Sequence, residues 1–175
     1  YILTEIANYL NNDHEIIIIC GPEFYRKRKV FGLQHQKLKI KRVKDLRIHG
    51  SSLLIKLINS ISSSFLLFFK SLSEIRRGDT ILTITNPPLN IILIAIATYF
   101  TKCKSILIVH DVFPDNLVPL KILKTNGVLF KYLSKIFNYY YSRYDTIITL
   151  GNDMKSLIIN KLNKNTHNVI LIPNW

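Results

Sequence analysis

The chain has 175 residues, 48% of them hydrophobic and 11% aromatic, which is enough apolar material for a globular core and excludes a disordered chain. Twenty-four Lys and Arg stand against eleven Asp and Glu, and this formal net charge of +13 predicts an anionic partner. Cys20 and Cys103 have neither CxxC spacing nor a His/Cys cluster beside them, so we expect a reducing compartment, no disulfide, no metal and no cofactor.

The N-terminal part of the chain predicts a helix followed by two strands. Apolar residues recur at helical spacing over residues 2–10. Residues 15–20 are a β-branched run that is too short for a helix and ends at a Gly-Pro pair, which predicts a buried parallel strand. Residues 21–36 are expected to form a loop, and residues 38–43 alternate apolar and basic side chains as a half-exposed strand does.

Basic residues gather in that loop and strand. After Glu23, Asp45 is the only opposing charge in the cluster, so we expect a surface patch that binds an anion or an anionic membrane. The alternative is a Lys-rich composition that merely solvates the surface, although this explains the lysines better than the arginines. The residues assigned to anion or membrane binding are Arg26, Lys27, Arg28, Lys29, Lys39, Lys41 and Arg42, with Lys37, Lys44 and Arg47 beside them.

The longest apolar-rich run extends from Leu53 to Phe69. It contains Lys56 and a serine triplet at 62–64, which a bilayer-spanning helix of about 20 residues would carry poorly. We therefore favour an amphipathic helix over residues 51–73, packed on a sheet, above a transmembrane span. The apolar positions that recur at helical spacing are Leu54, Ile58, Ile61, Phe65, Phe69 and Leu72.

From residue 79 onward, short β-branched runs alternate with helical patterns. This alternation predicts an α/β fold with a parallel sheet. The expected strands are residues 80–84, 105–109, 145–150 and 168–172, and the expected helices are residues 89–100, 128–141 and 152–162.

Two of these strands stop at residues suited to a polar ligand. Strand 80–84 is followed by residues 85–88 (TNPP), and strand 105–109 is followed by His110 and Asp111. The carboxyl ends of parallel strands open onto the same crevice, so we expect a ligand site there.

The sequence resembles the amino-terminal half of a GT-B glycosyltransferase of retaining family 4, especially the bacterial surface-polysaccharide branch. The resemblance implies a Rossmann-like parallel sheet with helices on both faces. The first strand of that sheet is missing here, and its place would be between strands 15–20 and 80–84. The resemblance rests on residues 12–15 (NDHE), 85–88 (TNPP), 110–115 (HDVFPD) and 172–175 (IPNW).

This resemblance further implies a single acceptor-binding domain over residues 1–175, cut at both ends, without the C-terminal domain that grips a nucleotide-sugar donor. The full-length protein would pass a sugar from that donor to a lipid-linked saccharide during capsule, O-antigen or exopolysaccharide synthesis. It would be cytoplasmic and peripheral at the inner face of the cytoplasmic membrane. The 175-residue piece alone is expected to be inactive.

Four residues acquire roles through the resemblance. His110 matches a histidine beside the donor sugar and is the expected catalytic residue, although a histidine at a strand end is often purely structural. Asn86, Asp111 and Asp115 are expected substrate contacts. The alternatives are that Asn86 belongs to a helix start and that Asp115 is an ordinary helix cap.

Two other classes of protein remain as alternatives. A nucleic-acid-binding module is favoured by the charge and by the tyrosines of residues 139–141 beside Arg143, but those tyrosines fall in a helix that needs an apolar face and no recognition motif accompanies them. We therefore expect no nucleic acid partner. A nucleotide-dependent dehydrogenase needs a GxGxxG turn, which the sequence does not contain.

Overall fold

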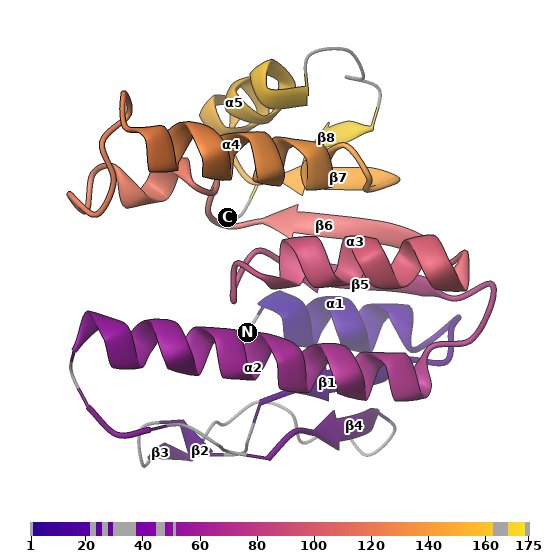
Figure 1. Ribbon diagram of the computed structural model, residues 1–175. Helices are drawn as coiled ribbons and strands as arrows, with labels where there is room; N and C mark the ends of the chain where they lie inside the picture. The colour runs from indigo at the N-terminus through magenta and orange to yellow at the C-terminus, as the bar shows by residue number, and fades with distance from the viewer. Residues whose placement is uncertain are drawn as a thin grey trace. The chain divides into compact units, whose positions relative to one another are not determined.

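The computed structural model describes residues 2–21, 24–25, 28–29, 38–44, 48–50, 52–162 and 168–173. The chain divides into two compact units, residues 1–73 and residues 74–175 (Figure 1). Each unit is described by itself below. The expectation of one domain over the whole chain stays a prediction.

The first unit contains one small parallel sheet. β1 pairs in parallel with β4, with Ile18 opposite Ile40, while β2 and β3 form a separate antiparallel pair. This confirms the predicted helix and the positions of the two predicted strands. The burial predicted for the first strand is wrong, because Ile17 is exposed and the rest of β1 is half-buried. The loop expected over residues 21–36 also contains the short strands β2 and β3. The elements are α1 (Ile2–Leu10), β1 (Ile17–Cys20), β2 (Phe24–Tyr25), β3 (Arg28–Lys29), β4 (Lys39–Arg42) and α2 (Leu53–Glu74).

The long helix α2 forms as predicted, but its apolar face is exposed rather than packed. The six apolar positions that predicted this face are each 37% to 69% exposed. Within α2 only Ser64 is buried, and its hydroxyl donates to Ser60 O at 2.8 Å. A helix of 22 residues is about 33 Å long, whereas the four-residue strands β1 and β4 span about 13 Å, so this small sheet cannot cover the helix.

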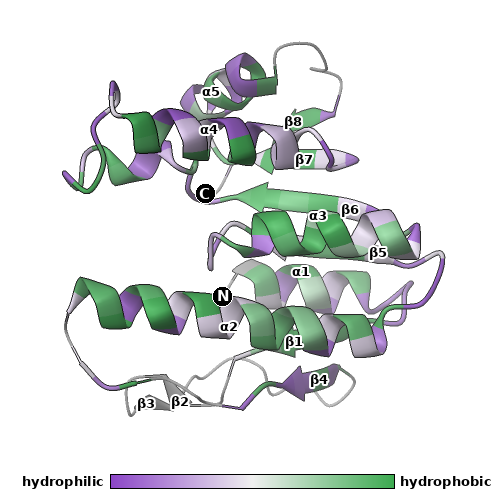
Figure 2. Cartoon of the chain, in the orientation of Figure 1, coloured by the Kyte–Doolittle hydropathy of each residue, from purple (hydrophilic) through white to green (hydrophobic). Residues whose placement is uncertain are grey.

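Hydrophobic residues dominate much of α2, with polar ones between them (Figure 2). By length and composition, α2 is the one helix in the described part of the chain that could cross a membrane. Core helices of soluble proteins meet the same criterion.

The second unit is a four-stranded parallel sheet with helices packed on it. The strand order is β5-β6-β7-β8, and α3 and α4 lie on the same face of the sheet (Figure 1). Parallel sheets flanked by helices confirm the predicted α/β class. The elements are β5 (Thr80–Ile84), α3 (Asn90–Thr101), β6 (Lys104–Val109), the 3-10 turn η1 (Asp115–Leu117), α4 (Val128–Tyr141), β7 (Thr146–Thr149), α5 (Asn152–Leu162) and β8 (Val169–Leu171).

The strands β1 and β5 each keep one unpaired edge. β1 is hydrogen-bonded to β4 and β5 to β6, and no other described strand pairs with either of them.

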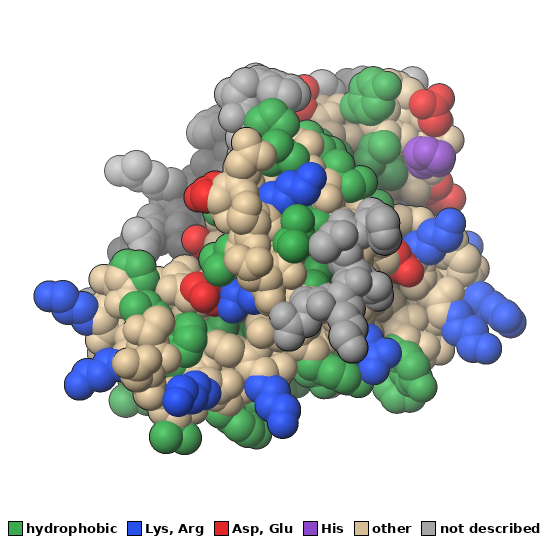
Figure 3. Space-filling model, turned by 90° about the horizontal axis from the view of Figure 1, so that it is seen from above, with side chains coloured by type: hydrophobic (Ala, Val, Ile, Leu, Met, Phe, Trp, Pro, Cys, Tyr) green, Lys and Arg blue, Asp and Glu red, His purple; other side chains and the backbone are tan. Residues whose placement is uncertain are grey.

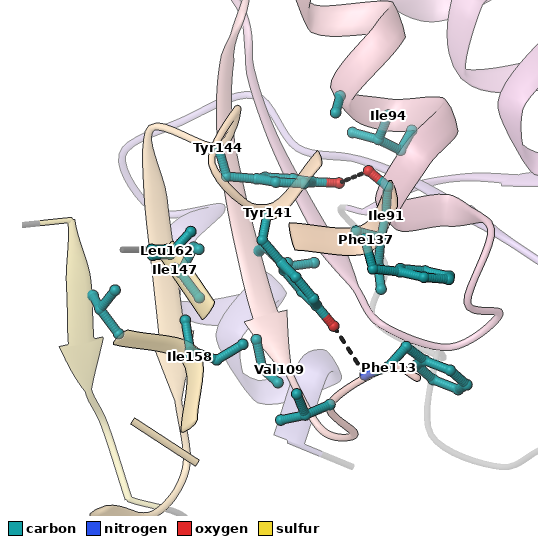
Figure 4. Packing of buried hydrophobic residues seen from close by; sticks show 14 residues of the cluster. Ile91, Ile94, Val109, Phe113, Phe137, Tyr141, Tyr144, Ile147, Ile158 and Leu162 are labelled. Atoms are coloured by element: carbon teal, nitrogen blue, oxygen red, sulfur yellow. Dashed lines mark hydrogen bonds between the residues drawn. The ribbon is translucent and has the colours of Figure 1, made fainter. Parts of the chain in front are cut away.

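The core of the second unit lies between the sheet and its helices (Figure 4). Ile91 from α3, Leu107 from β6 and Ile147 from β7 are fully buried in it. Tyr144 brings a hydroxyl into this core and donates it to Ile91 O at 2.9 Å. Burial, together with the neighbouring Tyr141, raises the pKa of Tyr144 far above its ordinary value, so this phenol stays protonated.

Candidate functional site

The carboxyl ends of β5 and β6 are joined by one buried threonine. Thr85 follows β5 and is fully buried. Its Oγ1 accepts hydrogen bonds from the backbone N–H groups of His110 and Asp111, both at 3.1 Å. The structure therefore brings together the two strand ends that the sequence predicts to open onto one crevice.

Three of the predicted site residues lie at this edge of the sheet. His110 is half-buried, while Asn86 and Asp111 are exposed. An imidazole, an amide and a carboxylate can each form hydrogen bonds with hydroxyl groups, and the amide and the imidazole can both donate and accept them. The arrangement is suited to a polyhydroxylated ligand.

The segment after Asp111 is anchored to α4. The backbone N–H of Phe113 donates to the Tyr141 hydroxyl at 3.1 Å (Figure 4), and the Phe113–Pro114 peptide bond is cis. Burial raises the pKa of Tyr141 well above its ordinary value; the hydrogen bond from Phe113 opposes this shift, and the charges of Asp115 and Asp111 add to it. Tyr141 is therefore a neutral phenol.

Asp115 is held differently from Asp111. Its Oδ2 lies 2.5 Å from Nζ of Lys161 in the last turn of α5, and the two side chains are 28% and 8% exposed. Asp115 thus connects η1 to α5. The structure gives the Asp115 carboxylate a structural partner in Lys161. The substrate contact expected for Asp115 stays a prediction.

Lys39, Lys41 and Arg42 of the basic cluster lie on β4. Lys39 forms an ion pair with Glu15, and both side chains are more than half exposed, so the pair adds little stability. Arg42 Nη1 lies 3.5 Å from Gly21 O and 3.6 Å from Cys20 Sγ, which ties the end of β4 to the end of β1. Lys41 follows Ile40 on the same strand and is exposed.

The other members of the cluster are only partly within the described residues. Arg28 and Lys29 form β3, whose side chains lie outside the described part of the structure, and Arg26 and Lys27 lie outside it altogether. On the face of the molecule drawn in Figure 3, exposed Lys and Arg side chains occur with hydrophobic side chains between them, without being assigned to this cluster.

An open groove of about 440 Å³ lies in the first unit, between the end of β4 and α2. Cations and apolar side chains share its lining, and no acidic residue is among them. Sequence analysis missed this combination because it assigned the β4 cations to a patch and the α2 residues to a packed face. The lining residues are Arg42, Val43, Lys44, Leu66, Phe69, Lys70 and Ser73.

Sequence analysis also missed the roles of Thr85 and Tyr141. Thr85 directly precedes the predicted contact Asn86, and this position at a strand end was the one available signal. Tyr141 was considered only as a helix residue and as one of the tyrosines that would favour nucleic acid binding. Across the described residues, no group of three or more His, Cys, Asp or Glu side chains could hold a metal ion.

No family model matches the chain. Over 129 residues the chain is 36% identical to WbjE of Pseudomonas aeruginosa, a probable glycosyltransferase. The chain is related to this probable glycosyltransferase. The matched segment is 74% of this chain and 32% of WbjE, so the chain spans about a third of the length of that relative. The resemblance to a glycosyltransferase is thereby confirmed at this general level.

Proposed function

We propose that this chain is the acceptor-binding half of a retaining glycosyltransferase of the GT-B type, family 4. The full-length protein transfers a sugar from a nucleotide-sugar donor to a lipid-linked saccharide in surface-polysaccharide synthesis. The observation that carries the proposal is the joining of residues 85–86 to residues 110–111 at the carboxyl edge of a parallel sheet, in a chain related to a glycosyltransferase.

Each residue at this edge has a role in the proposal. His110 hydrogen-bonds a hydroxyl of the donor sugar and helps to orient the anomeric carbon. Asn86 and Asp111 bind hydroxyls of the acceptor, and Asp115 either contacts the acceptor or holds η1 in place through Lys161. The donor nucleotide is bound by a second domain, so residues 1–175 alone do not turn over, and no metal or other cofactor takes part.

A lipid-linked acceptor requires the enzyme to work at a membrane. The net charge of +13 and the groove that combines Arg42 and Lys44 with Phe69 support docking on anionic lipid. Each Lys or Arg near such a surface contributes about 1 kcal/mol of attraction. The proposed location is the cytoplasmic face of the inner membrane, with peripheral and salt-sensitive attachment.

Nucleic acid binding is a weaker explanation of the same charge. Tyr141 is fully buried, and its hydroxyl is engaged by Phe113, so it cannot stack on a base. Tyr139 is exposed, but the guanidinium of Arg143 lies 4.6 Å from its ring centroid and donates to its hydroxyl at 2.7 Å. Tyr139 and Tyr141 are therefore both engaged by other residues of this chain rather than free to stack on bases.

The test is a transfer assay with the purified full-length protein. Radiolabelled UDP- and GDP-sugars are offered in turn, with a lipid extract of bacterial membranes as the source of acceptor. We expect label to enter the organic phase and NMR to show the anomeric configuration of the donor in the product. Inversion would contradict the retaining mechanism, failure of all donors would contradict glycosyl transfer, and turnover by residues 1–175 alone would contradict the need for a second domain.

A further inference from the structure

Two buried hydroxyl groups from outside the segment hold the turn at residues 110–113. Thr85, at the end of β5, accepts the N–H groups of His110 and Asp111. Tyr141, at the end of α4, accepts the N–H of Phe113. Three of the four backbone N–H groups in this turn are thus bound by side chains rather than by the sheet.

We infer that Thr85 and Tyr141 are positioning residues, which fix the turn at residues 110–113 and thereby aim His110 and Asp111 at the substrate. The inference rests on the proposed function for its catalytic consequence. The hold on the turn is independent of that function and can be measured separately.

The hydroxyl of Thr85 is well placed to fix the direction of the His110 side chain. Successive N–H groups of an extended chain point to opposite sides, so a single acceptor for residues 110 and 111 requires the chain to bend directly after β6. Without this acceptor, both N–H groups lose a partner beside the buried Thr85 and must turn toward water. His110 and Asp111 would turn with them.

Tyr141 fixes the far end of the same turn. Its ring lies in the core, with the Phe137 ring centroid 6.5 Å away, and Phe137 in turn stacks on Phe113 with a centroid distance of 5.9 Å. The phenol cannot swing aside without opening this packing. Because Tyr141 stays protonated, its oxygen remains a neutral acceptor for the Phe113 N–H.

The chain offers a matched control for each residue. Thr149, at the end of β7, is as fully buried as Thr85, but its hydroxyl donates to Ile170 O at 3.3 Å within the sheet. Tyr144 is as buried as Tyr141, and its hydroxyl donates to Ile91 O. Neither control hydroxyl hydrogen-bonds to the turn, so each reports the stability cost of losing a buried hydroxyl without the positioning effect.

The first experiment measures hydrogen exchange in the full-length protein by mass spectrometry. Thr85→Val keeps the shape of threonine and removes the acceptor, so we expect peptides containing residues 110–113 to exchange at least tenfold faster. Tyr141→Phe should do the same at residue 113, whereas Thr149→Val and Tyr144→Phe should leave this turn protected. Unchanged exchange in Thr85→Val and Tyr141→Phe, or equal acceleration in the controls, would overturn the inference.

The second experiment measures turnover of the same variants. We expect kcat to fall about tenfold in Thr85→Val and Tyr141→Phe, and Thr85→Ser to retain most of it because the hydroxyl is kept. The control variants should lose thermal stability but keep kcat. If kcat falls in proportion to stability across all variants, including the controls, Thr85 and Tyr141 have a merely structural role. If hydrogen exchange at the turn becomes faster but His110→Ala is fully active, the proposed site is refuted while the positioning of the turn is still shown.

Discussion

Lys161 in the last turn of α5 places Nζ 2.5 Å from Oδ2 of Asp115 at the start of η1. The pair joins a predicted substrate residue to a helix that sequence analysis connected with no function. The Lys161 side chain is only 8% exposed and the Asp115 side chain 28%, so the lysine depends more on its partner than the aspartate does.

The first prediction follows from that asymmetry. Asp115→Ala leaves a nearly buried ammonium without its partner and should lower the free energy of unfolding by about 3 kcal/mol, whereas Lys161→Met should cost only about 1 kcal/mol because the Asp115 side chain is the more exposed of the two. Urea unfolding measures both. Equal costs would show that Lys161 moves to solvent once Asp115 is removed.

Asp115→Asn and Lys161→Met separate a structural role of Asp115 from acceptor binding. If Asp115 contacts the acceptor directly, Asp115→Asn should raise the KM for the acceptor while Lys161→Met leaves it unchanged. If Asp115 acts by holding η1, both variants should change this KM in the same direction. Steady-state kinetics on the full-length protein decides between the two.

The second prediction concerns His110. His110→Ala in the full-length protein should lower turnover at least tenfold, which corresponds to about 1.4 kcal/mol of activation free energy, with little change in melting temperature. Turnover should fall because His110 is half-buried at the carboxyl edge of the sheet, where the substrate is proposed to bind. Stability should change little because the hydrogen bond to Thr85 comes from the His110 backbone N–H and not from its imidazole. Unchanged turnover would exclude a catalytic role.

The order of elements in the second unit was predictable because each depends on local pattern. The helix at 128–141 and the strand at 80–84 were predicted with the bounds they have, since helical spacing and β-branched runs are properties of neighbouring residues. The strand predicted at 15–20 is present from Ile17 to Cys20, but it is exposed or half-buried rather than buried, because only β4 pairs with it among the described strands.

The contacts that shape the site were not predictable in this way. Thr85 and Asp111 are 26 positions apart, and Tyr141 and Phe113 are 28 apart, so their meeting depends on how strands and helices pack in three dimensions. The exposed apolar face of α2 shows the same limit. Its spacing predicts a face that needs cover, but the spacing does not identify what covers it.

The third prediction is a loss of stability at alkaline pH. Burial raises the pKa of Tyr141 and Tyr144 above the value of about 10 that tyrosine has in an unfolded chain. A raised pKa in the folded state means that the stabilisation is fully present below about pH 10 and is lost as the pH rises toward the folded-state values. In that window, the effect of each buried tyrosine should be a decrease in the free energy of unfolding of up to about 1.4 kcal/mol for each unit by which the pH rises.

Urea unfolding between pH 8 and pH 11 tests this prediction. Tyr141→Phe and Tyr144→Phe should each flatten the decline above pH 10, because phenylalanine has no proton to lose. Tyr99→Phe is the matched control, since Tyr99 is 74% exposed. A decline that is equally steep in all three variants would assign the alkaline loss to other groups.

The fourth prediction separates membrane binding from nucleic acid binding. Changing Arg26, Lys27, Arg28 and Lys29 to Glu should abolish binding to anionic vesicles. Loss of about 1 kcal/mol of attraction at each position amounts to about 4 kcal/mol, or roughly a thousandfold, before any repulsion is added. Flotation of the protein with vesicles rich in phosphatidylserine measures the change.

The control for this charge reversal changes four lysines of the second unit to Glu, namely Lys121, Lys124, Lys131 and Lys135, which are all exposed. It alters the net charge by the same amount, so it should keep most of the vesicle binding if the basic cluster, rather than overall charge, is responsible. Salt should weaken the unmodified protein as well, because the Debye length falls from about 10 Å at 0.1 M to about 3 Å at 1 M. Equal binding to zwitterionic and anionic vesicles would contradict the lipid role, and tight retention of single-stranded RNA at physiological salt would favour the nucleic acid alternative.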